Sequence, residues 1–282
     1  MNKNKPVFIS CIDHSVSGEK FDLLYDEEYD MLITTPQPDP EKLPKYYETE
    51  EYISHTDSKK NAFEKIYQLI KKYSLNKKIK LVNKHTSKKG SMLDIGAGTG
   101  DFLLAAKKNG WITQGIEPNE NARNLAKGKK IQLVDDINNL NGKKYDVITM
   151  WHVLEHIPNL IEHIKTLQNL LSDDGVLIIA VPNYKSYDAL YYKEFWAAYD
   201  VPRHLWHFSK KSIENLFLKE RLKVIKTKAL KFDSYYVSLL SEKYKTGQMN
   251  PIKAFYIGLK SNLKAKSTGN YSSIIYIIKK LK

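Results

Sequence analysis

Cysteine is nearly absent from this sequence of 282 residues, in which Cys11 is the only one. A single cysteine cannot form an internal disulfide and cannot supply a multi-cysteine zinc or iron-sulfur site. Long apolar runs are missing as well, since a run such as 176–181 is far shorter than the roughly 20 residues that span a bilayer. Residues 1–20 have neither the apolar core nor the cleavage site of a secretory signal. We therefore expect a cytoplasmic protein without a transmembrane segment.

Arginine is scarce too. Lysine and arginine together number 45 against 32 acidic residues, giving a net charge of +13, yet only Arg123, Arg203 and Arg221 are arginines. Base-edge readout and bidentate phosphate binding favour the guanidinium group, whereas lysine acts as a hydrated point charge. The sequence therefore argues against a nucleic-acid partner. We interpret the excess as a lysine-rich solvated surface, with a polyanionic partner as the alternative.

The middle of the chain alternates between short apolar runs and helical patterns. Such alternation predicts an α/β fold with a doubly wound, mostly parallel sheet, in which ligands bind beyond the carboxyl ends of the strands. The expected strands are 92–95, 112–116, 131–134, 145–150, 176–181, 222–230 and 273–278, and the expected helices between the first five are 102–108, 119–127 and 158–171.

Two further regions flank or interrupt this pattern. Residues 1–88 are rich in Tyr, Lys, Glu and Pro, and their closely spaced prolines forbid a helix over 36–44, whereas apolar steps of three and four predict one over 61–75. We expect 1–88 to form an N-terminal lid or cap region and 89–282 to form the main domain. Residues 183–210 and 231–271 would be substrate-side insertions, the second with helices at 235–240 and 251–263 that cover the pocket or form a dimer face.

The turn after the first strand of the main domain carries the strongest signal. Residues 94–100 are D-I-G-A-G-T-G, and glycines there let the backbone pass close to a ligand. Dinucleotide-binding folds use G-x-G-x-x-G, whereas here the third glycine comes one residue early. The carboxylate of Asp94 would also repel a pyrophosphate, although it suits a cation. Both features argue against a pyrophosphate-bearing cofactor.

This turn resembles motif I of the class I S-adenosylmethionine-dependent methyltransferases, D/E-x-G-x-G-x-G. Residues 152–156, H-V-L-E-H, are similar to the signature of a subgroup that contains small-molecule and quinone-precursor methyltransferases. The resemblance implies S-adenosyl-L-methionine as the cofactor and a Rossmann-like sheet of seven strands with an antiparallel last strand. The cofactor-binding residues that it implies are Asp94, Gly96, Ala97, Gly98, Thr99, Gly100, Glu117, Pro118, Asp136, Ile137 and Trp151.

Two acids of this set have defined roles in the family. The resemblance implies that Glu117 accepts hydrogen bonds from both ribose hydroxyls, a task that suits a carboxylate. The alternative is an acid at a helix start, facing the helix dipole. Asp136 would accept from the adenine amine, with Ile137 against the ring. Asp135 competes for this role, and either acid could instead be a solvated loop residue.

Methyl transfer requires alignment and the exclusion of water, and an acceptor that must lose a proton also requires a general base. The candidate catalytic residues are His152, His156 and His204, with a structural role in the core as the alternative for His156. Arg203 beside His204 predicts an anionic group on the acceptor, unless it only closes a loop against Asp200.

Aromatic residues crowd positions 183–210. We expect them to line a substrate pocket, with Tyr187 and Trp196 as substrate-binding residues. The alternative is an insertion that uses its aromatic side chains as its own core.

No bound metal is expected. Some quinone-pathway relatives place E-x-x-E-H at the position of 152–156 and use a divalent cation. Here His152, Glu155 and His156 would form a softer ligand set, more suited to zinc than to magnesium, and this set is kept as an alternative.

The N-terminal region resembles the degenerate zinc ribbon that precedes some methyltransferases of this group. Cys11 and His14 would be a remnant of one ligand pair, and one pair cannot hold a structural zinc. Tyr46-Tyr47 and residues 52–55 resemble the family's Y-Y motif that covers the cofactor. We therefore expect a metal-free lid.

Taken together, these features predict an S-adenosylmethionine-dependent methyltransferase that acts on the oxygen, nitrogen or carbon of a small-molecule or lipid-like acceptor, as a monomer or homodimer. One alternative is an NAD(P)-dependent oxidoreductase, which the glycine spacing opposes. Another is a non-catalytic cofactor-binding module that regulates a partner. A third is a nucleic-acid methyltransferase, opposed by the lack of an Asn/Asp-Pro-Pro-aromatic motif after the fourth strand.

Overall fold

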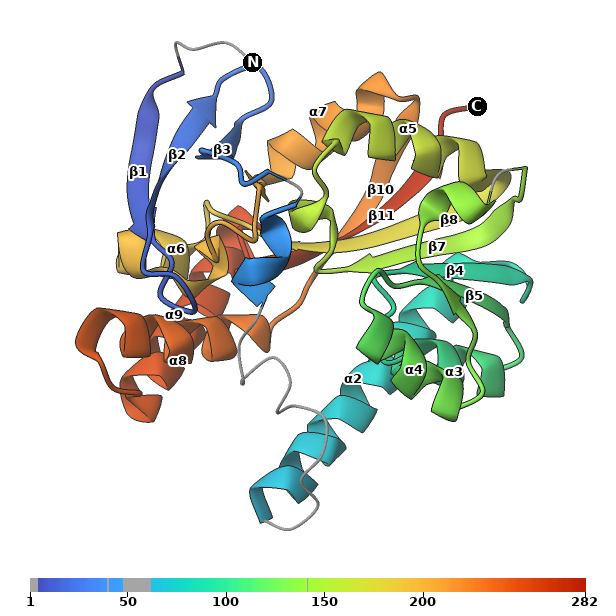
Figure 1. The fold of residues 1–282 in the computed structure, drawn as a ribbon, viewed down its shortest axis with the longest axis horizontal. Helices are drawn as coiled ribbons and strands as arrows, with labels where there is room; N and C mark the ends of the chain where they lie inside the picture. The colour runs from blue at the N-terminus through green and yellow to red at the C-terminus, as the bar shows by residue number, and fades with distance from the viewer. Residues whose placement is uncertain (1–4, 40, 48–61, 141) are drawn as a thin grey trace.

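The structure is a computed structural model that describes residues 5–39, 41–47, 62–140 and 142–282. Within these residues the strands form two sheets, one of seven strands and one of four. Figure 1 shows the larger sheet and the smaller sheet side by side, with a pair of helices, α8 (Asp233–Thr246) and α9 (Pro251–Thr268), at one edge of the molecule.

The larger sheet has the strand order β10-β11-β8-β7-β4-β5-β6. Its central strands pair in parallel, whereas β11 is antiparallel to both of its neighbours. The predicted mostly parallel, Rossmann-like sheet of seven strands is therefore confirmed. Strands β5 and β6 lie on one side of β4, and β7 and β8 lie on the other. The strand order therefore reverses at β4, and sheets of this kind bind ligands at such a switch point. The strands are β4 (Ser91–Ile95), β5 (Ile112–Ile116), β6 (Leu133–Val134), β7 (Tyr145–Trp151), β8 (Leu171–Pro182), β10 (Leu222–Ala229) and β11 (Ser273–Lys280).

Helices cover both faces of this sheet, with α5 and α7 on one face and α2 and α3 on the other (Figure 1). Because alternate residues of a strand point to opposite faces, β4 gives Leu93 to one core and Met92 to the other. Ile164 and Phe217 pack in the first core and Val82 in the second. The helices are α2 (Ala62–His85), α3 (Asp101–Lys108), α4 (Glu120–Gly128), α5 (Leu160–Leu170) and α7 (Lys210–Lys219).

Capping residues determine where several helices begin or end. The Asn119 side chain accepts a hydrogen bond from Ala122 N at the start of α4, and Asn250 caps α9 in the same way, ahead of Pro251. Gly269, at φ +74°, ends α9 in the left-handed conformation that favours glycine.

Three of the helices that pack on the larger sheet differ clearly from the sequence prediction. Helix α5 begins at Leu160, so Pro158 precedes the helix and does not occupy its first turn. Helix α2 continues to His85, well beyond the predicted end at residue 75, because Ile79 and Val82 pack under the larger sheet. Helix α7 was not predicted, although Ser209 and Ser212 form a capping box at its start.

The smaller sheet joins the N-terminal region to a distant segment. Its order is β1-β2-β3-β9, and Leu32 and Ile33 of β3 pair with His207 and Trp206 of β9. Buried residues of the N-terminal strands share a hydrophobic cluster with the aromatic side chains that follow β8. The chain division at residue 88 stays a prediction. The elements are β1 (Val7–Ile12), β2 (Lys20–Asp26), β3 (Met31–Thr35), β9 (Trp206–His207) and α6 (Tyr187–Tyr192), with short 3-10 helices η1 (Leu43–Tyr47), η2 (Ile137–Leu140), η3 (Leu154–His156), η4 (Lys193–Phe195) and η5 (Ala197–Tyr199).

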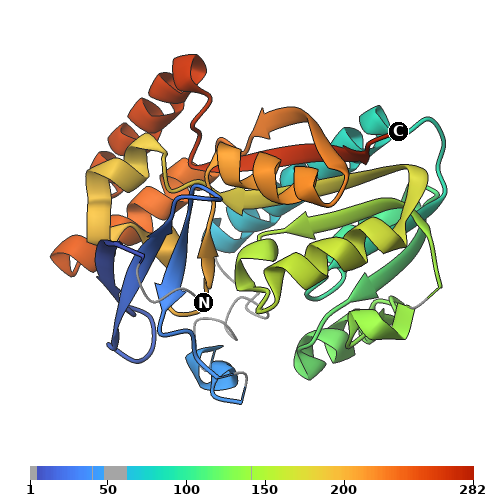
Figure 2. The same cartoon turned by 90° about the horizontal axis from the view of Figure 1, so that it is seen from above.

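The segment between β10 and β11 forms a pair of packed helices, α8 (Asp233–Thr246) and α9 (Pro251–Thr268). Both were predicted, but with shorter bounds. Figure 2, a view from above, shows α9 projecting beside the larger sheet. None of the helices in the described part of the chain is long and apolar enough to cross a membrane.

Candidate active site

The turn between β4 and α3 is built by glycines in the left-handed region. The φ angle is +69° at Gly96, +52° at Gly98 and +76° at Gly100. A Cβ on Gly96 would lie 2.4 Å from a methyl carbon of Val153, so the fold leaves no room for a side chain there. A Cβ on Gly98 would meet no atom within 4 Å. The turn is therefore fixed at Gly96 and open at Gly98.

Asp94 lies in β4, just before this turn, and is buried. Thr149 Oγ1 donates a hydrogen bond to Asp94 Oδ1 at 2.6 Å. Burial raises the pKa of Asp94 to about 7, although the Thr149 hydrogen bond and the Lys78 ammonium act in the opposite direction. Lys78 Nζ lies 4.3 Å from the centre of the Trp151 ring. A ligand cation near Asp94 would favour its ionised form.

Glu117, directly after β5, reaches across to the glycine turn. Gly98 N donates to Glu117 Oε2 at 2.8 Å, and Asn119 N donates to Oε1 at 2.9 Å. Each carboxylate oxygen keeps a further lone pair for a ligand hydroxyl. The carbonyl of Pro118 accepts from Arg123 Nη1 at 2.6 Å, which holds the backbone after Glu117. The structure thus brings Glu117 and Gly98 together.

The two acids that follow β6 are both exposed. Asn138 N donates to Asp136 Oδ1 at 2.6 Å, whereas Asn139 Nδ2 donates to Asp135 Oδ1 at 2.9 Å. Ile137 is partly buried against the main core. Each acid is held by a local contact, so the geometry leaves the choice between them open.

The other turn residues make local contacts. Ala97 N donates to the carbonyl of Ile116 at 2.9 Å, which ties the turn to β5. Thr99 Oγ1 donates to Asp101 Oδ2 at 3.1 Å. Their predicted role at the cofactor would use their backbones.

His152 follows β7 with a φ of +58°. Its Nε2 lies 3.0 Å from Asp233 Oδ2 of α8, and its Nδ1 lies 3.4 Å from Glu155 Oε1. Burial alone would lower the pKa of His152, but the two carboxylates outweigh it and raise the pKa to about 10. His152 is therefore a cation at neutral pH, which makes it the weakest of the three candidates for a general base.

His156 and His204 meet edge to face, with ring centres 4.6 Å apart. His156 Nδ1 lies 3.0 Å from the carbonyl of Arg203, and His204 Nδ1 lies 2.9 Å from the carbonyl of Ala198. Because a carbonyl only accepts, each Nδ1 donates, and in a neutral ring the lone pair is at Nε2. Burial, and then the nearby His204, lower the pKa of His156 to about 4, so its ring is neutral at pH 7.

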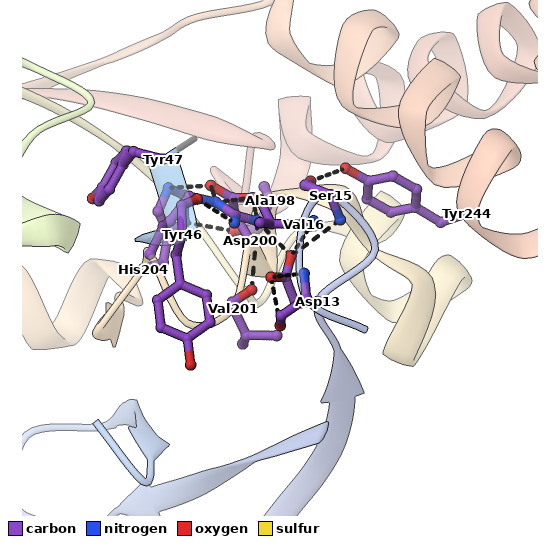
Figure 3. A network of polar contacts seen from close by, with 12 residues as sticks. Asp13, Ser15, Val16, Tyr46, Tyr47, Ala198, Asp200, Val201, His204 and Tyr244 are labelled. Atoms are coloured by element: carbon purple, nitrogen blue, oxygen red, sulfur yellow. Dashed lines mark hydrogen bonds and ion pairs between the residues drawn. The ribbon is translucent and has the colours of Figure 1, made fainter. Parts of the chain in front are cut away.

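Arg203 is buried, and all three nitrogens of its guanidinium donate to protein oxygens. Nη2 donates to Asp200 Oδ1 at 2.7 Å and to Asp13 Oδ1 at 2.9 Å, Nε donates to Asp200, and Nη1 donates to the carbonyl of Tyr46 at 2.9 Å. Figure 3 shows Asp13, Asp200 and Tyr46 converging in this network. Four of the five N–H groups of Arg203 are thus engaged inside the protein, and its predicted contact with an anionic acceptor stays a prediction.

A cavity of about 570 Å³ lies beside these residues. Tyr187 and Trp196 are not among the described residues that line it, and their role as substrate-binding residues stays a prediction. Trp196 is buried, and its Nε1 donates to Asp188 Oδ2 at 2.8 Å, while Tyr187 packs against the same cluster. The aromatic side chains after β8 thus form a core shared with the N-terminal sheet. Residues that do line the cavity include His14, Tyr46, Tyr47, His152, His156, Arg203, His204, Tyr236, Leu240 and Tyr244.

A family model described as a methyltransferase domain matches residues 60–227 of the chain. The chain belongs to this family. The predicted membership of the class I S-adenosylmethionine-dependent methyltransferases is confirmed by this match together with the fold.

Curated relatives of this methyltransferase match it over part of its length. The ubiquinone biosynthesis O-methyltransferase of Haemophilus ducreyi is 30% identical over 106 residues, which cover 33% of this chain and 45% of that protein. The enzyme of the same name from Coxiella burnetii is 28% identical over 122 residues, covering 39% and 52%. The chain thus spans about half the length of these relatives.

Solved structures share the methyltransferase fold at low identity. The magnesium protoporphyrin IX methyltransferase of Synechocystis PCC 6803 with bound SAH has a TM-score of 0.55 and 15% identity, covering 85% of this chain and 99% of that one. The cyclopropane synthase MmaA2 of Mycobacterium tuberculosis has a TM-score of 0.51 and 14% identity, covering 72% and 83%.

Three residues of this methyltransferase can hold a metal ion. The ligand atoms of Glu155, His156 and His204 all lie within 4.8 Å of one another. Both carboxylate oxygens of Glu155 are buried and have no hydrogen-bond partner among the described residues, although Oε1 lies 3.4 Å from His152 Nδ1. Both histidines donate from Nδ1 to a carbonyl, an arrangement that leaves Nε2 for a metal. This set differs from the one kept open in the sequence, because His152 pairs with Asp233. The absence of a metal stays a prediction.

Sequence reasoning missed Asp13, Lys78 and Asp233. Asp13 stands between Cys11 and His14, where the sequence suggested only metal ligands. Its Oδ1 also accepts a hydrogen bond from Ser15 N at 3.0 Å. Each of these residues acts through a contact with a residue that is distant in the sequence, and no local sequence pattern predicts such a contact. Within the predicted lid, Tyr47 contacts His156 Nδ1 through its hydroxyl at 3.1 Å, whereas residues 52–55 lie outside the described residues.

Proposed function

We propose that the protein transfers a methyl group from S-adenosylmethionine to an oxygen, nitrogen or carbon of a small-molecule or lipid-like acceptor in the cavity of about 570 Å³. The observation that supports this most is the presence of both parts of a site in one fold. The glycine turn is open and is linked to Glu117 through Gly98 N, and a cavity is lined by His156 and His204. The names of the curated relatives favour an acceptor hydroxyl.

The cofactor would lie along the carboxyl ends of β4, β5 and β6. Glu117 would accept hydrogen bonds from the ribose hydroxyls and Asp136 from the adenine amine, while the backbone of residues 96–100 would border the ligand. Asp94 would face the positively charged part of the cofactor, which would stabilise its carboxylate. Trp151 and Lys78, stacked beside Asp94, would border the same end.

The acceptor's proton would pass to a histidine. As the acceptor oxygen forms its bond to the methyl carbon, the carbon–sulfur bond breaks, the O–H bond breaks and S-adenosylhomocysteine leaves. A pKa of about 4 makes His156 a poor proton acceptor. We therefore assign the general base to Nε2 of His204 and a positioning role to His156, whose Nδ1 holds the Arg203 carbonyl at 3.0 Å.

The test has two arms. Calorimetric titration of the full chain should show binding of S-adenosylmethionine and S-adenosylhomocysteine and no binding of NAD; binding of NAD alone would instead establish the oxidoreductase alternative. Incubation with methyl-labelled cofactor and a panel of phenols and lipid-like hydroxyl compounds should label at least one acceptor.

A histidine variant separates an enzyme from a binding module. His204→Gln should lose at least about 100-fold in turnover, the lower end for loss of a general base, and keep its cofactor affinity. His163→Gln is the matched control, because His163 lies on α5, away from the lining of the cavity. Equal turnover in both variants would contradict the role of His204.

A further inference from the structure

Helix α9 carries an apolar stripe on its solvent face. Five large apolar residues of this helix are 37% to 86% exposed and recur at steps of three and four, so they share one face. The inward face consists of Ile257 together with small or polar residues. An ordinary surface helix buries most of its large apolar side chains, whereas α9 exposes five of them and buries one, Ile257. The exposed residues are Ile252, Phe255, Tyr256, Leu259 and Leu263, and the buried ones include Ala254, Gly258, Ser261, Asn262 and Ala265.

Positive charge accompanies the stripe. Residues 251–268 contain four lysines and no acidic residue. Helical periodicity places Lys253, Lys260 and Lys264 along one flank of the stripe, and Lys266 at its C-terminal end. Of these, Lys253 forms an ion pair with Glu242 of α8 at 3.3 Å, and the ammonium groups of Lys260 and Lys264 lie over the Tyr187 ring. The chain as a whole carries a net charge of +13.

We propose that α9 is a docking helix that lies in the headgroup region of an anionic lipid bilayer. An interfacial helix of this kind has aromatic and aliphatic side chains on one face and lysines beside them, as α9 has. Lysines near an anionic surface each add attraction, and an exposed apolar patch of this kind marks an interaction site. A second copy of the chain fits less well, since a symmetric contact through α9 would bring lysine-rich helices together with no acidic residue on either.

The position of α9 connects this surface with the cavity. Helix α9 packs on α8, where Gly258 lies so close to Tyr235 that a Cβ would approach it within 2.8 Å. Helix α8 in turn gives Tyr236, Leu240 and Tyr244 to the cavity lining. Docking would therefore place the cavity wall next to the bilayer, where a lipid-like acceptor resides. This last step rests on the proposed function, whereas docking itself does not.

Vesicle sedimentation with the full chain tests the proposal. We expect the protein to pellet with vesicles of phosphatidylcholine and phosphatidylglycerol in equal parts, and to stay in solution with phosphatidylcholine alone. Added salt should weaken binding, because it screens the lysines. Equal binding to both vesicles, or binding to neither, would overturn the proposal.

Two pairs of variants locate the contact. Ile252→Ser with Leu263→Ser should weaken vesicle binding about tenfold or more, since each removes an apolar side chain from the interface. Lys264→Gln with Lys266→Gln should weaken it by about fivefold per lysine. The matched controls are Ile112→Ser, on a residue that is 75% exposed at the start of β5, and Lys108→Gln on α3, and both should bind vesicles as the parent does.

Further measurements distinguish the remaining outcomes. Light scattering that shows a dimer, dissociated by the Ile252 and Leu263 changes, together with no vesicle binding, would assign the stripe to a second copy and refute bilayer docking. Cofactor affinity measured on the same variants should be unchanged. A docking variant that binds vesicles poorly and cofactor normally supports docking even if no acceptor is ever methylated.

Discussion

The two halves of the site hold their charges in opposite ways. On the cofactor side, Asp94 has one hydrogen bond, from Thr149, and a pKa raised to about 7, and the backbone at Gly98 faces open space. On the acceptor side, Arg203 donates to Asp13, to Asp200 and to a backbone carbonyl. On the cofactor side, Asp94 can still interact with a positively charged ligand. On the acceptor side, the ion pairs of Arg203 instead hold the cavity wall in place.

The largest effect on stability is expected from a change on the acceptor side. Arg203→Met would leave Asp13 and Asp200 without their cation, and breaking a buried pair in this way costs about 3–5 kcal/mol of the free energy of unfolding. Urea denaturation measures it. Arg221→Met, at an exposed arginine, is the control and should cost less than about 0.5 kcal/mol. A stable Arg203→Met protein that has lost only acceptor affinity would show instead that Arg203 binds the acceptor.

Two glycine variants sharpen the comparison within the cofactor side. Gly96→Ala would drive a Cβ against Val153 in a left-handed backbone, so we expect a loss of about 1–3 kcal/mol in the free energy of unfolding. Gly98→Ala is also strained, at a φ of +52°, but its Cβ meets no protein atom within 4 Å, so it should cost less stability than Gly96→Ala, about 1 kcal/mol, and should weaken cofactor binding. Thermal denaturation and calorimetry on both variants check this split. Equal stability losses with unchanged affinity would mean that no ligand lies against Gly98.

How far the sequence could predict the molecule follows the same division. The cofactor side depends on short segments, such as the glycines of 94–100, which carry their own backbone requirement wherever they occur. The acceptor side depends on contacts between distant residues, as when Arg203 meets Asp13, 190 positions away, or when β3 pairs with β9. Neither contact leaves a periodic or local pattern. Trp196 is an example: its residue type fitted a pocket or a core equally well, and only the fold placed it in the core.

Cofactor affinity should depend on pH through Asp94. Its pKa of about 7 lies above the usual 3.8, so the native protein holds a proton that the unfolded chain has released, and stability falls as pH rises from about 4 to about 7. A cationic cofactor favours the ionised form, so its affinity should rise, by about tenfold at most, between about pH 6 and pH 8. Calorimetry across this range measures the slope. In Asp94→Asn the slope should disappear, and an unchanged slope would assign it to another group.

The smallest effect concerns His152, which links β7 to α8 through Asp233 and also contacts Glu155. Its pKa of about 10 lies above the usual 6.5, so the native state binds a proton more tightly than the unfolded chain does. The resulting stability is complete below pH 6.5 and is lost as pH rises toward 10. Because the His152 side chain is 36% exposed, solvent screening limits the contribution to about 1 kcal/mol or less. In thermal denaturation between these pH values, His152→Gln should therefore show a smaller decline than the parent protein. An identical decline would mean that the ion pair with Asp233 contributes nothing to stability, and that the link between β7 and α8 depends on packing alone.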